Sequence, residues 1–171
     1  MQGIKKKLDV LDVRGAVIRN TNIGVITVSF IMLLLLAVSW GVSIEFEGGK
    51  LKRRHAGSIL AFIIVFCTLV FDIVSLFCAP KKAVFFILQG LVMLSVFLTA
   101  VSTGMASIVV DICAAGEPVA NGVHCAAHAL EFAAGFLLIA ALAVIFAVSQ
   151  QRLVTLEEAG VLQGFGTQVK G

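Results

Sequence analysis

Long apolar stretches separated by short polar segments dominate the chain. They span residues 23–44, 57–79, 83–110 and 126–149. A helix that crosses a bilayer needs roughly 20 mostly apolar residues, and each stretch reaches that length. The runs are continuous, without the alternation of polar and apolar positions that is typical of a barrel strand. The pattern therefore predicts an all-α integral membrane protein whose main domain, residues 23–149, is a four-helix bundle.

Residues 1–22, before the first stretch, form a basic segment in which Ile4, Leu8, Leu11 and Ile18 recur at helical spacing. We expect an amphipathic helix on the cytoplasmic interface, with Lys5, Lys6 and Lys7 at anionic lipid headgroups. The same charges would also act as a positive flank that sets the topology. The first stretch exceeds the roughly 7–15 apolar residues of a signal peptide, and no small-residue cleavage site follows, so we expect it to be retained.

Composition and charge indicate how the bundle is oriented. Hydrophobic residues make up 60% of the chain, charged residues only 13%, and the mean hydropathy is +1.07, which leaves almost no soluble domain. Residues 150–171 form a short cytoplasmic tail. Of the 13 Lys and Arg residues, only four fall on the side of the first loop: Lys50, Lys52, Arg53 and Arg54. The excess on the other side predicts cytoplasmic termini and a multi-pass protein of the plasma membrane or a secretory-pathway membrane.

Two cysteines, Cys113 and Cys125, bracket the third loop, which is net acidic and rich in turn-forming residues. With cytoplasmic termini this loop faces the lumen or exterior, where disulfides persist. We expect a Cys113–Cys125 disulfide that stabilises the short loop by about 3 kcal/mol. Two free thiols are the alternative. A metal site that adds His124 and His128 fits no common zinc spacing, so no metal is expected.

The other two cysteines lie in or near the second stretch. Cys67, within it, is most simply a small buried hydrophobic residue. Cys78 precedes Pro80, Lys81 and Lys82 at the expected cytoplasmic end of the helix. A thiol beside basic residues at a membrane boundary is a palmitoylation candidate, and an ordinary interfacial cysteine is the alternative.

Small residues recur at helical spacing in the last two stretches. They are Ala100, Gly104, Ala129, Ala133, Ala140, Ala143 and Ala147. Small side chains let two helix backbones approach closely, so we expect these residues to form helix-packing faces. The packing would be either within the bundle or between copies of the chain, and the spacing does not separate the two.

Asp72 is the charged residue deepest in a predicted span, roughly 12 Å from the helix end at Pro80. A carboxylate at such depth costs about 2.5–3.5 kcal/mol on insertion scales. Gln89, Thr27 and Ser29 are expected at a similar depth, where they would complete a polar layer. Structural hydrogen bonding is the favoured role, ahead of contact with a partner or lipid and ahead of transport.

Near the third loop, Asp111, His124, His128 and Glu131 gather within a few turns of helix. Glu131 and His128 are neighbours on one helix face, and a carboxylate–imidazole pair is suited to acid–base chemistry. Glu131 is close enough to the helix end for its side chain to reach the headgroups. The sequence offers no accompanying nucleophile and no common catalytic or phosphate-binding motif. We therefore expect neither an enzyme nor a bound cofactor.

The second half of the chain resembles the MARVEL-type tetraspan membrane proteins. The resemblance is carried by FLTAVSTGMASIVVDIC (Phe97 to Cys113), the loop to Cys125, and the following CAAHALEFAAGFLLIAALAVIFAVS. The short first and second loops and the glycine-ended tail look like the fungal branch associated with plasma-membrane microdomains and non-classical export. Family members are expected to have a more aromatic fourth helix, whereas this one has only Phe132, Phe136 and Phe146. The resemblance implies vesicle trafficking or microdomain organisation.

These features favour a non-enzymatic tetraspan organiser that makes lateral contacts with helices and lipids. The expected partners are membrane lipids and a second copy or another membrane protein, and not nucleic acid. A small accessory subunit of a larger membrane complex, such as a pump, synthase or transporter, is the alternative. A carrier or channel would need a continuous polar path, which the sequence does not trace.

Overall fold

The computed structural model describes residues 2–46, 53–77, 81–114 and 122–160. Side chains are described at positions 13–42, 58–77, 81–111, 113 and 122–160. The predicted headgroup contacts of Lys5, Lys6 and Lys7 therefore lie outside the described side chains, and the palmitoylation candidate Cys78 lies outside the described residues.

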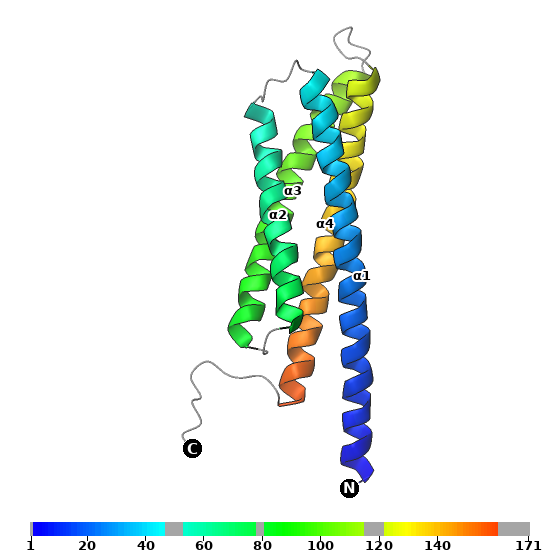
Figure 1. Ribbon diagram of the computed structural model, residues 1–171, viewed down its shortest axis with the longest axis vertical. Coiled ribbons are helices and arrows are strands. Elements are labelled where there is room, and N and C mark those ends of the chain that lie inside the picture. Colours follow the sequence, from blue (N-terminus) through cyan, green and yellow to red (C-terminus); the bar gives the residue numbers. More distant parts are fainter. Residues whose placement is uncertain (1, 47–52, 78–80, 115–121, 161–171) are drawn as a thin grey trace.

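The chain folds into four long helices that run alternately up and down (Figure 1). They are α1 (Gln2–Phe46), α2 (Arg53–Phe77), α3 (Lys82–Ala114) and α4 (Gly122–Glu158). Each contains a segment long and apolar enough to cross a membrane. The predicted all-α four-helix membrane bundle is confirmed, and the chain is a multi-pass integral membrane protein. The start of α1 and the end of α4 lie at one end of the bundle, called here the termini end, and the end of α3 and the start of α4 lie at the other, the disulfide end (Figure 1).

The helices pack in a ring in which each contacts the helices before and after it in sequence, and α4 closes the ring against α1. The α1–α4 and α3–α4 interfaces are the broadest, whereas α1 and α2 share the narrowest one. Aromatic rings fill part of that narrow interface. Trp40 lies edge-on to Phe62 with 5.4 Å between ring centroids, and Phe30 lies edge-on to Phe66 at 5.9 Å.

Two helices extend beyond their predicted ends. The predicted basic segment 1–22 is not a separate helix, because α1 runs unbroken from Gln2 through the first span. No proline interrupts it, and proline is the residue that most strongly breaks a helix. α4 continues past residue 149 and ends at Glu158, and Gly160 just beyond it has a φ of 68°, which suits a left-handed C-cap. The Gly160 N–H donates to the Glu157 carbonyl oxygen at 3.0 Å.

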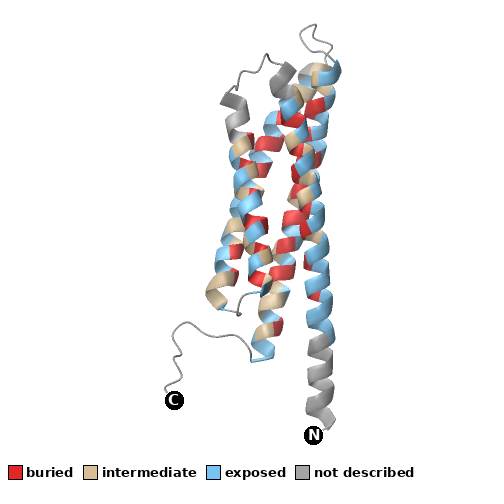
Figure 2. Cartoon of the chain, in the orientation of Figure 1, coloured by how far each residue is buried: buried red, intermediate tan, exposed pale blue. Residues whose placement is uncertain are grey.

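The core is a narrow apolar column along the bundle axis, flanked by exposed outer faces (Figure 2). On α4 the buried positions recur every three or four residues, which is the spacing of one helix face. The outer faces are apolar as well, as expected where they contact lipid. The column is built around Leu33, Leu36, Val65, Leu69, Val92, Leu138 and Leu142.

The small residues predicted to pack either within the bundle or between copies of the chain face outward. Ala100, Gly104, Ala129, Ala133 and Ala140 are all exposed, as are Ala143 and Ala147. Within-bundle packing was therefore the wrong reading for them. Other small residues on α4 face the core: Ala134 and Ala141, each one position after an exposed alanine, together with Ala127 and Gly135. Neighbouring positions on a helix differ by about 100°, so a shift of one residue moves the packing face.

Cys67 was predicted to be buried, but it is an exposed free cysteine. It lies between Phe66, also exposed, and the buried Thr68, so it points away from the axis. A cysteine is apolar enough to face lipid tails, and burial in the protein core was not required for it.

Close packing between α3 and α4 gives the first testable prediction. A Cβ added at Gly135 would overlap Oγ1 of Thr103 and lie 3.3 Å from its Cβ, whereas a Cβ at Gly104 meets nothing within 4 Å. We expect Gly135→Ala to lose about 1–3 kcal/mol of unfolding free energy through overpacking. The matched control Gly104→Ala should be neutral or gain about 0.5–1 kcal/mol from helix propensity. Denaturation in mixed micelles measures both, and equal stability of the two variants would contradict the packing described.

Candidate functional site: two polar networks in the bundle core

The first polar network lies near the disulfide end and centres on Glu131 of α4. Its Oε1 accepts a hydrogen bond from Trp40 Nε1–H of α1 at 3.0 Å and another from Ser58 Oγ of α2 at 3.2 Å. Ser58 is also hydrogen-bonded to Ser102 of α3 at 2.7 Å. One carboxylate therefore connects all four helices. Glu131 is only 5% exposed, so the prediction that it reaches the headgroups is wrong; it shares the core-facing side of α4 with Ala134 and Gly135.

Two histidines extend this network toward the disulfide end. Nδ1 of His128 lies 3.1 Å from Glu131 Oε2, and both side chains are buried. The His124 ring stands edge-on to His128 with 4.6 Å between centroids. Ser39 of α1 donates to the Ala127 carbonyl oxygen at 2.6 Å, which adds a second α1–α4 bond one turn from Glu131. The predicted carboxylate–imidazole pair therefore exists, but inside the bundle. Asp111 is exposed and does not join it.

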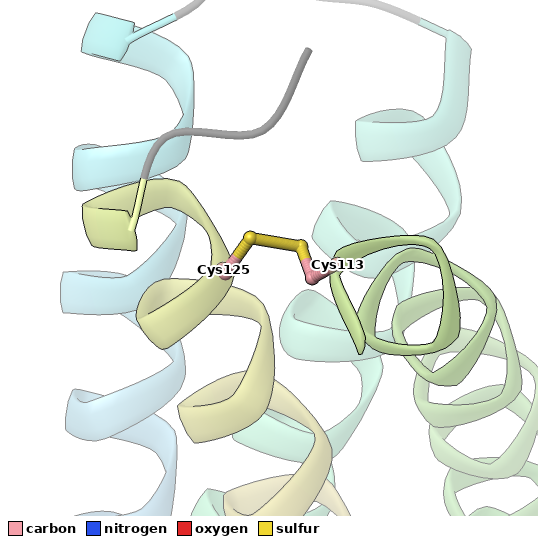
Figure 3. The surroundings of a disulfide bond; sticks show 2 residues. All are labelled: Cys113 and Cys125. Atoms are coloured by element: carbon pink, nitrogen blue, oxygen red, sulfur yellow. A yellow bond between two sulfur atoms is a disulfide. The ribbon is translucent and has the colours of Figure 1, made fainter. Parts of the chain in front are cut away.

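The predicted disulfide between Cys113 and Cys125 is formed, with 5.8 Å between the two Cα atoms. It joins the end of α3 to the first turn of α4 (Figure 3). Cys125 lies one turn before His128, so the bridge holds α4 beside α3 close to where Glu131 meets Ser58. Within the described residues, no three His, Cys, Asp or Glu side chains gather in a metal-binding arrangement.

The second network lies near the termini end and centres on Asp72 of α2, which is 1% exposed. Nδ2 of Asn22 on α1 donates to Asp72 Oδ1 at 3.1 Å. Arg152 of α4 donates to the Ser75 carbonyl oxygen at 2.8 Å and to Ser75 Oγ at 3.3 Å. Its guanidinium also stacks over the Phe85 ring of α3, 5.3 Å from the centroid. This network too includes a residue from every helix.

The predicted polar layer around Asp72 forms with different partners. Gln89 is half-buried, and its Nε2 has no hydrogen-bond partner among the described residues. Thr27 is exposed and donates to the Ile23 carbonyl oxygen of its own helix, and Ser29 donates to that of Val25. Asn22 and Arg152 were the residues missed. Their position in the sequence could have indicated them, because each lies just outside a predicted apolar stretch, where a polar side chain can reach back into the bundle.

Hydroxyl groups occupy the core between the two networks. Thr68 of α2 and Ser95 of α3 are hydrogen-bonded at 2.8 Å. A cavity of about 10 Å³ lies between Trp40, Ser58, Thr99 and Ser102, roughly the space of one water molecule. Residues 58 and 72 are about 21 Å apart along α2 at 1.5 Å per residue. Fully buried Val65, Leu69, Val92 and Leu142 pack through this interval.

The two networks are suited to holding helices together. Both carboxylates are engaged by donors from other helices, and neither is paired with a cysteine or with an exposed nucleophile in the described part of the chain. In the interval Thr68 is hydrogen-bonded to Ser95 and to the Ile64 carbonyl oxygen, and Thr99 Oγ1, which has no partner among the described residues, belongs to a residue that borders the small cavity. Interhelical hydrogen bonds of this kind contribute roughly 0.6 kcal/mol each in a membrane protein, and at most about 1.7.

A double-mutant cycle measures the bond between Trp40 and Glu131. We expect Trp40→Phe and Glu131→Ala each to lower the unfolding free energy, with a coupling of about 0.6–1.7 kcal/mol. Glu131→Gln keeps one acceptor oxygen and should lose less than Glu131→Ala. Glu157→Ala is the control, because its ion pair with Lys82 is substantially exposed and contributes roughly 0–1 kcal/mol. Additive effects of the two core substitutions would show that the bond does not stabilise the bundle.

Comparisons with known proteins place this chain in no family. No protein-family model, no curated protein and no solved structure matches it. The MARVEL-type resemblance therefore stays a prediction from the sequence, and the function is argued from the geometry of the bundle.

Proposed function

We propose that the chain is a non-enzymatic tetraspan protein that organises its membrane through lateral contacts with helices and lipids. The observation that carries the proposal is a row of small residues on the outer face of α4, called here the alanine seam. Ala126, Ala133, Ala140 and Ala147 recur every seven residues, and Ala129 and Ala143 lie between them, all exposed. A repeat of seven is the spacing at which one helix packs along another.

The alanine seam has more small side chains than the other lipid-facing surfaces of the bundle, although Phe136, 64% exposed, lies in the same face between Ala129 and Ala143. Leu34 of α1, Phe66 of α2 and Phe97 of α3 are exposed by 67%, 45% and 64%, and they illustrate the large side chains typical of those faces. Large apolar groups suit contact with lipid tails. Alanines leave a shallow surface on which a second backbone can approach closely and gain van der Waals contact. Because the bundle does not use this face for its own packing, the seam is suited to a helix from outside.

The internal polar networks support the same function. Glu131 and Asp72 are each bound by donors from other helices, so the carboxylates serve the fold. This supports a non-enzymatic role and speaks against transport. The MARVEL-type resemblance adds vesicle trafficking or microdomain organisation, with cytoplasmic termini, in the plasma membrane or a membrane of the secretory pathway.

An accessory subunit of a larger membrane complex is the second candidate. The same seam supports it, because an alanine face accepts a helix from another protein as readily as one from a second copy. The candidates differ in the identity of that helix, which the following experiment determines.

Cross-linking tests the seam directly. In a Cys67→Ser, Cys78→Ser background, single Ala133→Cys or Ala140→Cys substitutions should give covalent dimers in native membranes under mild oxidation. Ile63→Cys on α2, also exposed, is the matched control and should stay monomeric. Adding Ala140→Leu should abolish the Ala133→Cys dimer, because a larger side chain separates the backbones.

Three results are distinguishable. Dimers confined to the seam positions support the organiser. Cross-linking at the seam to one different protein at fixed stoichiometry supports the accessory subunit instead. Equal dimer yields at Ile63→Cys and Ala133→Cys, or none at either, would overturn the proposal that the seam binds a helix.

A further inference from the structure

A cleft separates α1 from α4 at the termini end of the bundle. It consists of two adjoining hollows of about 340 and 140 Å³ that share Ile18 of α1 and Thr155 of α4. The smaller hollow also reaches Leu76 of α2 and has an apolar floor. It belongs to neither the alanine seam nor the core of the bundle.

Two arginines line the smaller hollow, Arg19 from α1 and Arg152 from α4. Arg19 is exposed and forms no ion pair or hydrogen bond with a described residue. Arg152 uses two of its nitrogens toward Ser75, which leaves further N–H groups of its five free to donate. The acid nearest to it, Asp72, is buried, accepts a hydrogen bond from Asn22, and attracts Arg152 electrostatically without lining the hollow. Two guanidinium groups therefore share a hollow that no acidic side chain lines.

The nearby acids at the end of α4 are already paired. Glu158 Oε2 lies 3.5 Å from Arg14 Nη1, and Glu157 Oε1 lies 2.6 Å from Lys82 Nζ. Arg14 borders the larger hollow but is thereby neutralised. Arg19 is thus the arginine of the cleft without a charge partner, whereas the charge of Arg152 is partly offset by Asp72 and Arg152 contributes mainly its remaining N–H donors.

The position of the smaller hollow relative to the ends of the apolar stretches indicates which kind of anion it would bind. Arg19 lies about one helical turn before the first apolar stretch, and Arg152 lies less than one turn after the last. Both are therefore at the boundary between the hydrocarbon and the water, where lipid phosphates lie. Ile18, Leu76 and Leu156 provide an apolar surface beside them. Arginine presents its N–H groups in a planar fork that matches phosphate oxygens.

The geometry points to a binding site for the phosphate group of an anionic membrane lipid, with Arg19 and Arg152 as its ligands. The lipid's glycerol and upper acyl chain lie against Ile18, Leu76 and Leu156. The site uses other residues than the alanine seam, so it goes beyond the proposed lateral function, and either can fail without the other.

The test uses the full chain in detergent and titrates it with fluorescent phosphatidic acid, with phosphatidylcholine as the zwitterionic reference. Arg19→Gln should weaken phosphatidic acid binding about tenfold, the loss expected for one charge-assisted bond to phosphate. The control Lys81→Gln removes one positive charge from an exposed side chain that lines neither hollow, and it should change binding less than twofold. Arg19 is exposed and without a described partner, so folding does not depend on it.

A second variant tests the hollow without changing its charge. Gly15 lines it, and a Cβ there meets nothing within 4 Å, so Gly15→Leu should fold and partly fill the space. We expect weaker phosphatidic acid binding, whereas Gly24→Leu, equally open but away from the cleft, should bind as the parent does. Unchanged binding in Gly15→Leu would overturn the site.

Two further outcomes would also overturn it. Equal losses in Arg19→Gln and Lys81→Gln would show binding to diffuse surface charge. Competition by soluble glycerol 3-phosphate at the same concentration as phosphatidic acid would show a site for a free phosphate compound, and not for a lipid.

Discussion

The buried carboxylate of Glu131 fixes how the helices meet at the disulfide end. In a bilayer, apolar side chains gain little by leaving lipid for a protein core, so apolar packing alone aligns helices weakly. A carboxylate left unpaired at that depth is costly, and Glu131 escapes the cost only where Trp40 and Ser58 reach it. Sliding α4 by one turn would move it about 5.4 Å away from both donors. The register of α4 against α1 and α2 therefore depends on this one group.

Asp72 imposes the same constraint at the other end. Its bond to Asn22 sets α1 against α2, and Arg152, held by Ser75 and stacked over Phe85, ties α4 to α2 and α3. Two polar anchors at the ends of an apolar column leave few alternative registers for the column between them. The Cys113–Cys125 bridge adds a covalent limit at the disulfide end. The narrow α1–α2 interface is accordingly held at its ends by polar groups, with aromatic rings between.

The sequence predicted the parts of this structure that depend on local composition. Four spans and a disulfide across a short acidic loop follow from run length and cysteine spacing. The sequence did not predict which face of each helix turns toward the core. Lipid and core are both apolar, so the usual contrast in polarity between the two faces of a helix is lost. On α4, alanines at 133 and 140 and at 134 and 141 have the same spacing, yet only the second pair is buried. Asp72 stood out by its depth, but Asn22 is 50 residues away from it in sequence.

The placement of the polar groups also bears on where function is located. A carrier or an enzyme needs polar groups that exchange partners during its cycle. If Glu131 exchanged its partners, it would lose its hydrogen bonds to Trp40 of α1 and Ser58 of α2 and its contact with His128 of α4. Loss of these bonds would release the register of the helices. Under the function proposed above, the interior polar groups serve the fold and recognition belongs to the outer surface, with its alanine seam and arginine-lined cleft.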